Sequence, residues 1–373
     1  MAARKQSSTR EQAGYAPDYW LLSSVLAMSA LGLVMVLSAS GVMAERFWQD
    51  RFFFFKKQLL FAGAGLVLMA LTARLPRKIF YKLVYLWLVL GFGLLAMTLS
   101  SLGIEAGGAR RWLSLGGVSF QALEMVKVAL VFYLAYFFSQ KQHLVKTFSV
   151  GFVPPVLITA GLSLLLLLQP DFGGAVFLAA LLFMVCLVAG TRFIYLFTSL
   201  ALASGTAVLL VLQSPYRFRR WFAFLDPFKD ALDSGYQLVQ SFYALGSGGL
   251  FGVGLGAGKQ KLFFLPDAHN DFILAVLGEE LGFAGTSFCF LCIGVVIWRS
   301  FRISTAQPDM QDRLTAYGLS LILIMGMLMN AAVVLGAVPP KGVPMPFVSY
   351  GGSQLLSAFF CVGMLLNLSR QVK

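Results

Sequence analysis

Long, uninterrupted apolar runs dominate this chain of 373 residues, of which 58% are hydrophobic and only 12% charged. A run of about 20 apolar residues crosses a bilayer as a helix. The runs are continuous rather than alternating, which excludes a transmembrane β-barrel. We therefore predict an all-α polytopic membrane protein with about ten transmembrane helices. The predicted spans are 19–43, 53–73, 80–100, 121–138, 149–168, 172–190, 192–212, 271–298, 313–338 and 347–369.

Basic residues predict the sidedness of these spans. If the N-terminus is cytoplasmic, the inner segments hold 15 Lys and Arg residues and the short outer loops hold 7, as the positive-inside rule requires. We expect both termini in the cytoplasm, with residues 1–18 as a tail and 19–373 as a single ten-span domain. Residues 213–270 then form a large extracytoplasmic loop between spans 7 and 8. The first run exceeds a signal-peptide core, so we expect an uncleaved span, although Val42-Met43-Ala44 resembles a cleavage site.

The net charge of +13 would suggest nucleic acid in a soluble protein. In a membrane protein, basic cytoplasmic segments instead contact anionic lipid. We expect membrane lipid and no nucleic acid among the partners.

Polar residues gather at the predicted outer ends of the spans. Asp271 is the first residue of span 8, and Asp171 precedes span 6. Glu124 and Lys127 lie in the first turns of span 4, and Ser349 lies in the segment PMPFVSYGGSQLL at the start of span 10. Ionisable residues in membranes are costly and often functional, so this side is the candidate site.

Glu124 and Lys127 are spaced i, i+3 and share a helix face. They are either an ion pair that lets both residues enter the membrane, or a pair that offers Lys127 to a phosphate. Asp271 also has two interpretations. It is either a helix N-cap, for which Asp is favoured, or a carboxylate base whose partial desolvation raises its pKa.

The predicted outer loop adds further candidates. Arg217, Arg219 and Arg220 alternate with aromatic residues and form either an interfacial anchor or a clamp on lipid phosphate. Arg110 and Arg111, beside Trp112, pose the same choice. His269 lies two residues before Asp271 and is a weaker candidate, because a lone loop histidine is usually structural. In the same loop, YQLVQSFYAL predicts a short amphipathic helix at the membrane interface.

Glu279 and Glu280 follow Asp271 by eight and nine residues, which places them roughly 12–13 Å along a continuous helix. They are too far away to share a proton with Asp271. We expect them to bind neighbouring helices or to cap broken ones, and Gly278 and Gly282 to form a close-packing surface.

Three segments carry a family resemblance: LLQPDFGGAVFL, GYQLVQSFYALGSGGLFGVGLGAGKQKLFFLPDAHNDFILAVLGEELGF and KGVPMPFVSYGGSQLL. Together they resemble the SEDS family of shape, elongation, division and sporulation proteins (FtsW, RodA and SpoVE), over nearly the whole chain. RRWFAFLDPFKD and DAHNDFI are most similar to the FtsW branch. The chain departs from the family where Ala122-Leu123-Glu124 replaces a usual PSE and Asn270 replaces a usual threonine.

The resemblance implies a peptidoglycan glycosyltransferase that polymerises lipid II, the undecaprenyl-pyrophosphate-linked disaccharide-pentapeptide, on the outer face of the bacterial inner membrane. It also implies Asp271 as the essential aspartate and a class B penicillin-binding protein as partner. Chemically, Asp271 would accept the proton of the attacking hydroxyl, and Lys127 and the loop arginines would neutralise the departing pyrophosphate.

No dedicated metal-ligand cluster is visible, so no cofactor is certain, and a divalent cation (Mg²⁺ or Mn²⁺) is only a suggestion from the family. Two other functions stay open: a lipid II flippase, which needs polar residues along the whole path across the bilayer, and a non-catalytic scaffold for a penicillin-binding protein. The clustering of charges on one side favours the enzyme.

Overall fold

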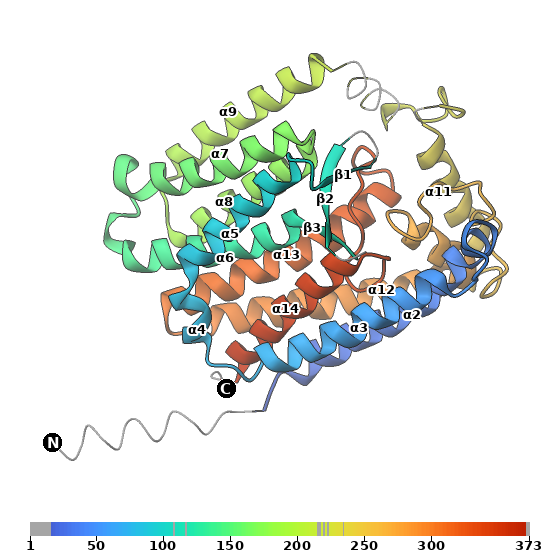
Figure 1. Cartoon of the computed structure of the whole chain (residues 1–373), viewed down its shortest axis with the longest axis horizontal. Helices are drawn as coiled ribbons and strands as arrows, with labels where there is room; N and C mark the ends of the chain where they lie inside the picture. The colour runs from blue at the N-terminus through green and yellow to red at the C-terminus, as the bar shows by residue number, and fades with distance from the viewer. Residues whose placement is uncertain are drawn as a thin grey trace.

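The computed structural model describes residues 16–106, 109–115, 118–214, 218, 221, 224–233 and 235–370. Their apolar runs form long helices that pack into one bundle, with a small sheet at one end (Figure 1). The helices are α2 (Tyr19–Trp48), α3 (Phe53–Thr72), α4 (Arg77–Lys82), α5 (Val84–Thr98), α6 (Ala122–Gln140), η2 (Gln142–Leu144), η3 (Phe148–Phe152), α7 (Val153–Leu168), α8 (Phe172–Ala189), α9 (Phe193–Leu212), α11 (Tyr236–Gly248), α12 (Ile273–Thr305), α13 (Met310–Val334) and α14 (Gly352–Ser369).

The predicted all-α membrane fold is confirmed. Within the described part of the chain, nine helices are long and apolar enough to cross a membrane. The predicted span 80–100 is divided instead: α4 ends at Lys82 and α5 has only 15 residues. Residues 236–248 form the predicted short helix, α11, within the segment between spans 7 and 8.

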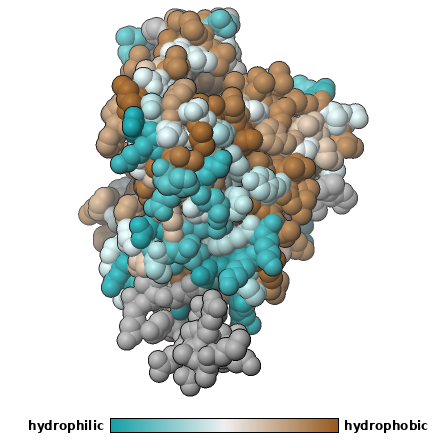
Figure 2. Space-filling view, turned by 90° about the vertical axis from the view of Figure 1, so that its left-hand side faces the viewer, coloured by the Kyte–Doolittle hydropathy of each residue, from teal (hydrophilic) through white to brown (hydrophobic). Residues whose placement is uncertain are grey.

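The N-terminal and C-terminal helices meet at one end of the membrane bundle. At this end, the backbone N–H of Asp18 donates to Ser369 Oγ at 3.2 Å, and Arg299 Nη2 lies 2.6 Å from Asp18 Oδ2. The first span therefore starts, and the last span finishes, on the same side of the bundle. We call this the Asp18 end, and the opposite end the Asp271 end. Figure 2 views the Asp18 end, where hydrophilic residues gather beside largely hydrophobic flanks.

The core follows α6, α13 and α14. In α6 and α14, 78% of the most apolar 18-residue stretch is buried inside the protein, whereas in α9 only 6% of the corresponding stretch is buried. Figure 1 shows α9 at the edge of the bundle. Polar residues on α6, α13 and α14 are thus enclosed by protein rather than by lipid.

A three-stranded antiparallel sheet fills the connection between α5 and α6, and the sequence patterns above did not predict it. Strands β1 (Gly103–Ala106), β2 (Ala109–Leu115) and β3 (Val118–Gln121) pair in the order β1-β2-β3. The sheet lies at the Asp271 end, where the backbone N–H of Gln121 donates to Ser353 Oγ at 3.0 Å. It carries Arg111 to the start of α8.

Helix α12 is broken at Gly282, whose φ of 65° and ψ of −159° are not helical, so the predicted continuous span 271–298 is wrong at this point. A break leaves carbonyls and N–H groups without helical partners, and the glycine-rich loop 249–254 supplies replacements. Its backbone packs directly on α12, and glycine at 248, 252 and 282 permits this close approach. The replacement bonds run from Val253 N to Glu279 O (3.0 Å), Gly254 N to Glu280 O (3.1 Å), Phe283 N to Gly249 O (2.9 Å) and Ala284 N to Leu250 O (3.0 Å).

Candidate functional site

A cavity of about 470 Å³ lies at the Asp271 end, among β2, α6, the start of α8, α13, α14 and the loop between α13 and α14. Most of its lining is apolar, and a few charged side chains converge on it from separate segments. This combination is typical of a ligand site. The charged lining residues are Arg111, Glu124, Lys127, Asp171 and Lys341.

Glu124 and Lys127 form the ion pair that their spacing predicts. Lys127 Nζ lies 2.8 Å from Glu124 Oε1, and the two side chains are 8% and 7% exposed. The same ammonium lies 4.8 Å from the centroid of the Phe177 ring, a favourable cation–π geometry. Because both residues also line the cavity, the ion pair and a ligand-facing role are compatible.

Asp171 is the N-cap of α8, where its Oδ1 accepts from the backbone N–H of Gly174 at 3.0 Å. Arg111 Nε lies 3.8 Å from the same carboxylate, and Arg111 Nη2 donates to Pro170 O at 2.9 Å. Asp171 thus stabilises the start of α8 and holds the Arg111 guanidinium at the cavity. Arg111 therefore adds a second positive charge there, besides that of Lys127.

Lys341 is a cavity residue that the sequence interpretation missed. Its Nζ donates to the carbonyl of Gly173 at 2.9 Å, and a side chain at position 173 would collide with Lys341. Burial lowers the pKa of Lys341 to about 8; nearby Asp171 raises it, and Arg111 and Lys127 lower it further. The cavity thus holds three basic side chains, from β2, α6 and the α13–α14 loop.

Asp271 lies behind the wall of this cavity and is not itself among the lining residues. The N-cap position of α12 is Phe272, one residue after Asp271. A Cβ at Gly342, which lines the cavity, would lie 3.0 Å from Asp271 Oδ2. Asp271 is half-buried, and its carboxylate lies next to one lining residue of the cavity that holds the basic side chains.

The other predicted site residues lie elsewhere. His269 packs between Phe54 and Tyr350, with ring centroids 4.8 and 5.8 Å away, and burial lowers its pKa to about 4. Ser349 Oγ accepts from the backbone N–H of Met345 at 2.7 Å and closes a turn. Neither residue lines the cavity. Arg217, Arg219 and Arg220 lie outside the described residues.

Glu279 and Glu280 are 3% and 0% exposed and bind both loop and helix. They accept backbone N–H groups of the loop between α11 and α12, together with the Ser38 hydroxyl on α2 and the Lys261 ammonium. The expectation that they bind a neighbouring helix is confirmed. The bonds to Glu279 come from Lys259 N (2.7 Å) and Gln260 N (3.2 Å), and those to Glu280 from Gly256 N (3.1 Å), Ser38 Oγ (2.6 Å) and Lys261 Nζ.

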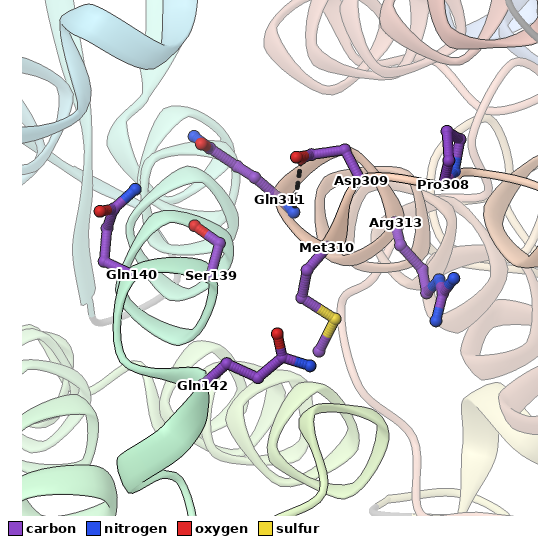
Figure 3. A pocket seen from close by; sticks show the side chains of 8 residues that line it. All are labelled: Ser139, Gln140, Gln142, Pro308, Asp309, Met310, Gln311 and Arg313. Carbon is purple, nitrogen blue, oxygen red and sulfur yellow. Dashed lines mark hydrogen bonds between the residues drawn. The ribbon is translucent and has the colours of Figure 1, made fainter.

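A second cavity, of about 350 Å³, lies at the Asp18 end beside the start of α13 (Figure 3). Asp309 caps α13 there by accepting from the backbone N–H groups of Gln311 and Asp312, and Arg313 donates to Gln307 O. Its charged groups therefore serve the local chain fold. Across the described residues, no three His, Cys, Asp or Glu side chains are placed to hold a metal ion together.

The chain matches the FtsW/RodA/SpoVE family, described as cell cycle proteins, over residues 19–373. It is 42% identical to the probable peptidoglycan glycosyltransferase FtsW of Trichlorobacter lovleyi, covering 95% of this chain and 94% of that protein. It is 40% identical to stage V sporulation protein E of Bacillus subtilis, covering 95% and 97%.

Solved structures show the same fold. A chain of a peptidoglycan synthase complex that coordinates polymerization and crosslinking matches with a TM-score of 0.78 at 29% identity, over 95% of this chain and 98% of that chain. The rod shape determining protein RodA of Thermus thermophilus matches with a TM-score of 0.71 at 29% identity, over 95% and 97%.

Proposed function

The chain belongs to the FtsW/RodA/SpoVE family of cell cycle proteins, and we propose that it is a membrane-embedded peptidoglycan glycosyltransferase that polymerises lipid II. The single observation that supports this chemistry best is the cavity at the Asp271 end. It combines three basic side chains with a largely apolar lining, and the Asp271 carboxylate lies next to Gly342, one of its lining residues. A glycosyl transfer with a pyrophosphate leaving group needs these three features together.

In this reaction a sugar hydroxyl of one chain attacks the anomeric carbon of another. The new glycosidic C–O bond forms as the bond from the anomeric carbon to the pyrophosphate oxygen breaks. Asp271 accepts the hydroxyl proton, and the departing undecaprenyl pyrophosphate takes the electron pair. Arg111, Lys127 and Lys341 stabilise the negative charge that develops on the leaving group.

The apolar lining has its own function, because water in the cavity would hydrolyse the donor. Lys341 also suits a pyrophosphate, since a ligand with negative charge favours the protonated ammonium. In this proposal three basic side chains of the protein supply the positive charge, and no divalent cation is required. Adding EDTA to the polymerisation assay tests this, because activity should then be unchanged.

We propose that the Asp271 end faces outward from the bacterial inner membrane, with both termini in the cytoplasm. The positive-inside count supports this orientation. A cysteine introduced at Lys259 should react with an impermeant thiol reagent in intact cells. The four native cysteines are buried, so they should give little background. Reaction only in permeabilised cells would reverse the orientation.

The packed core argues against a flippase. Beyond Lys127, α6 continues with Leu130, Phe132 and Leu134, which are all 0% exposed. These residues are buried between the cavity at the Asp271 end and the cavity in Figure 3. A transport path would need polar groups through this region, and a scaffold would have no use for a cationic cavity.

The decisive experiment gives labelled lipid II to the purified protein together with a class B penicillin-binding protein, the partner we propose. The relative that belongs to a peptidoglycan synthase complex supports such a pairing. We expect glycan polymer on a gel. Movement of lipid II across the vesicle membrane without polymer formation would identify a flippase. If neither polymer nor translocation is observed, the non-catalytic scaffold is the remaining function.

A further inference from the structure

Asn330 joins two irregular segments beside the candidate site. It lies on α13, four residues before the end of the helix, and is 1% exposed. Its Nδ2 donates to Asp271 O at 2.7 Å and to Val343 O at 2.9 Å. The two carbonyls fix the orientation of the amide, because its oxygen in the same place would repel both.

This bridge joins the backbone of Asp271 to a segment that lies beside its carboxylate. Val343 follows Gly342, the residue whose Cβ would lie 3.0 Å from Asp271 Oδ2. One amide thus ties the backbone of Asp271 to the cavity wall that its carboxylate contacts. Both segments are outside regular helices at these positions. Regular secondary structure therefore does not fix the distance between the backbone at Asp271 and the backbone at Val343.

We propose that Asn330 is a positioning residue that holds the Asp271 carboxylate at the cavity wall, a role that rests on the proposed glycosyltransferase function. Asn330 does not line the cavity, so its effect on the reaction passes through the two segments that it joins, at Asp271 and at Val343. A misplacement of about 1 Å in a reacting group can lower a rate about 10²-fold.

The chain offers a matched control at the opposite end. Asn367 on α14 also joins two backbone carbonyls with one amide, donating to Thr72 O at 3.0 Å and to Leu75 O at 2.8 Å. Its bridge lies at the Asp18 end, far from Asp271. Asn367→Ala removes the same number of bonds of the same kind without touching the site.

The test compares steady-state polymerisation by Asn330→Ala and Asn367→Ala. We expect Asn330→Ala to lower kcat by about 10- to 100-fold and to change the KM for lipid II by less than about threefold, because the cationic residues are untouched. Asn367→Ala should keep the parental kcat. Equal kcat values for Asn330→Ala and the parent would overturn the role.

A double mutant separates positioning from general damage. In an Asp271→Asn background, adding Asn330→Ala should cause little further loss, since residues that act as a unit are non-additive. A full multiplicative loss would mean that Asn330 acts elsewhere.

If Asn330→Ala does not insert stably, Gly342→Ala tests the same geometry with both Asn330 bonds intact. The added methyl group pushes on the Asp271 carboxylate, and kcat should fall while KM changes little; a parental kcat would overturn the role. Absence of polymer from the parent protein would instead refute the proposed function, which keeps the two failures distinguishable.

Discussion

Asp271 and the pair Glu279 and Glu280 lie eight residues apart in the sequence, but their surroundings differ. Glu279 and Glu280 are fully enclosed and accept hydrogen bonds from loop N–H groups, a hydroxyl and an ammonium. Asp271 is half-buried and lies against a glycine of the cavity wall. The carboxylates of Glu279 and Glu280 thus hold the fold of the loop, whereas Asp271 lies beside the cavity.

The glutamate pair and Asp271 also depend on each other. The glutamates fix residues 253–261 against α12 and α2, and the chain then continues to Asp271. The structural acids thus hold the base of the loop that ends in the proposed catalytic acid. Substitutions should separate the two roles, with activity lost at one position and stability lost at the other.

The largest effect is expected for Asp271→Asn. The amide keeps the size of the side chain but cannot accept a proton, so polymerisation should fall by about 10²-fold or more. Because asparagine keeps the size of the side chain and can still form hydrogen bonds, we expect little change in thermal stability. Labelled lipid II and a melting curve in detergent measure both quantities, and full-length glycan from this variant would remove Asp271 from the mechanism.

Glu280→Ala should do the reverse. It leaves the buried Lys261 ammonium, whose side chain is 5% exposed, without its carboxylate, and breaking a buried pair costs about 3 kcal/mol or more. We expect a lower melting temperature but a near-parental rate per folded molecule.

The matched control is Glu280→Leu combined with Lys261→Met, which removes both charges and should recover part of the stability. A variant of normal stability but no activity would place Glu280 in the chemistry.

A smaller, pH-dependent effect is expected at Lys341. Its pKa is lowered from 10.5 to about 8, so it loses its proton as the pH rises from 7 to 9. The KM for lipid II should then rise by roughly threefold or more. In Lys341→Arg, which stays charged, this rise should be absent. A KM that is constant over this range would separate Lys341 from the pyrophosphate.

The same shift affects folding in the opposite sense. The unfolded chain binds the Lys341 proton more tightly than the folded one, so this residue should make the protein more stable as the pH rises from about 8 toward 10.5. Lys341→Met removes the buried charge and should reduce this gain in melting temperature.

The smallest effect is expected for His269→Phe. The side chain packs between two rings, and burial keeps its pKa at about 4, so the imidazole is neutral at pH 7. A phenyl ring should preserve the packing, with a rate within about twofold of the parent. A large loss of polymerisation with normal stability would restore the candidate role that the sequence suggested.

Much of the fold could be predicted from the apolar runs, because a membrane helix is specified by its own composition. The divided span at Leu83, the sheet at 103–121 and the break at Gly282 could not. Each depends on partners distant in the sequence, such as the loop that completes α12. The sheet left one signal, the Gly-Gly pairs at 107–108 and 116–117, which are common in hairpin turns.

The site could be predicted in part. Glu124, Lys127 and Asp171 line the cavity because polar residues at span ends tend to meet, and Asp271 lies behind its wall. Lys341 was counted only as a loop charge, since burial among Pro339, Pro340 and Gly173 is a tertiary property. Asn330 left a signal that could have found it: an amide within an apolar span is a functional candidate.

The break at Gly282 bears on how the protein is made. Most membrane helices enter the bilayer with every backbone group already paired internally. In the folded protein, two carbonyls and two amides of α12 instead pair with residues 249–254. Those residues leave the ribosome before α12 does. We therefore expect docking of the preceding segment to accompany insertion of this span, because it completes the hydrogen bonding of the broken helix.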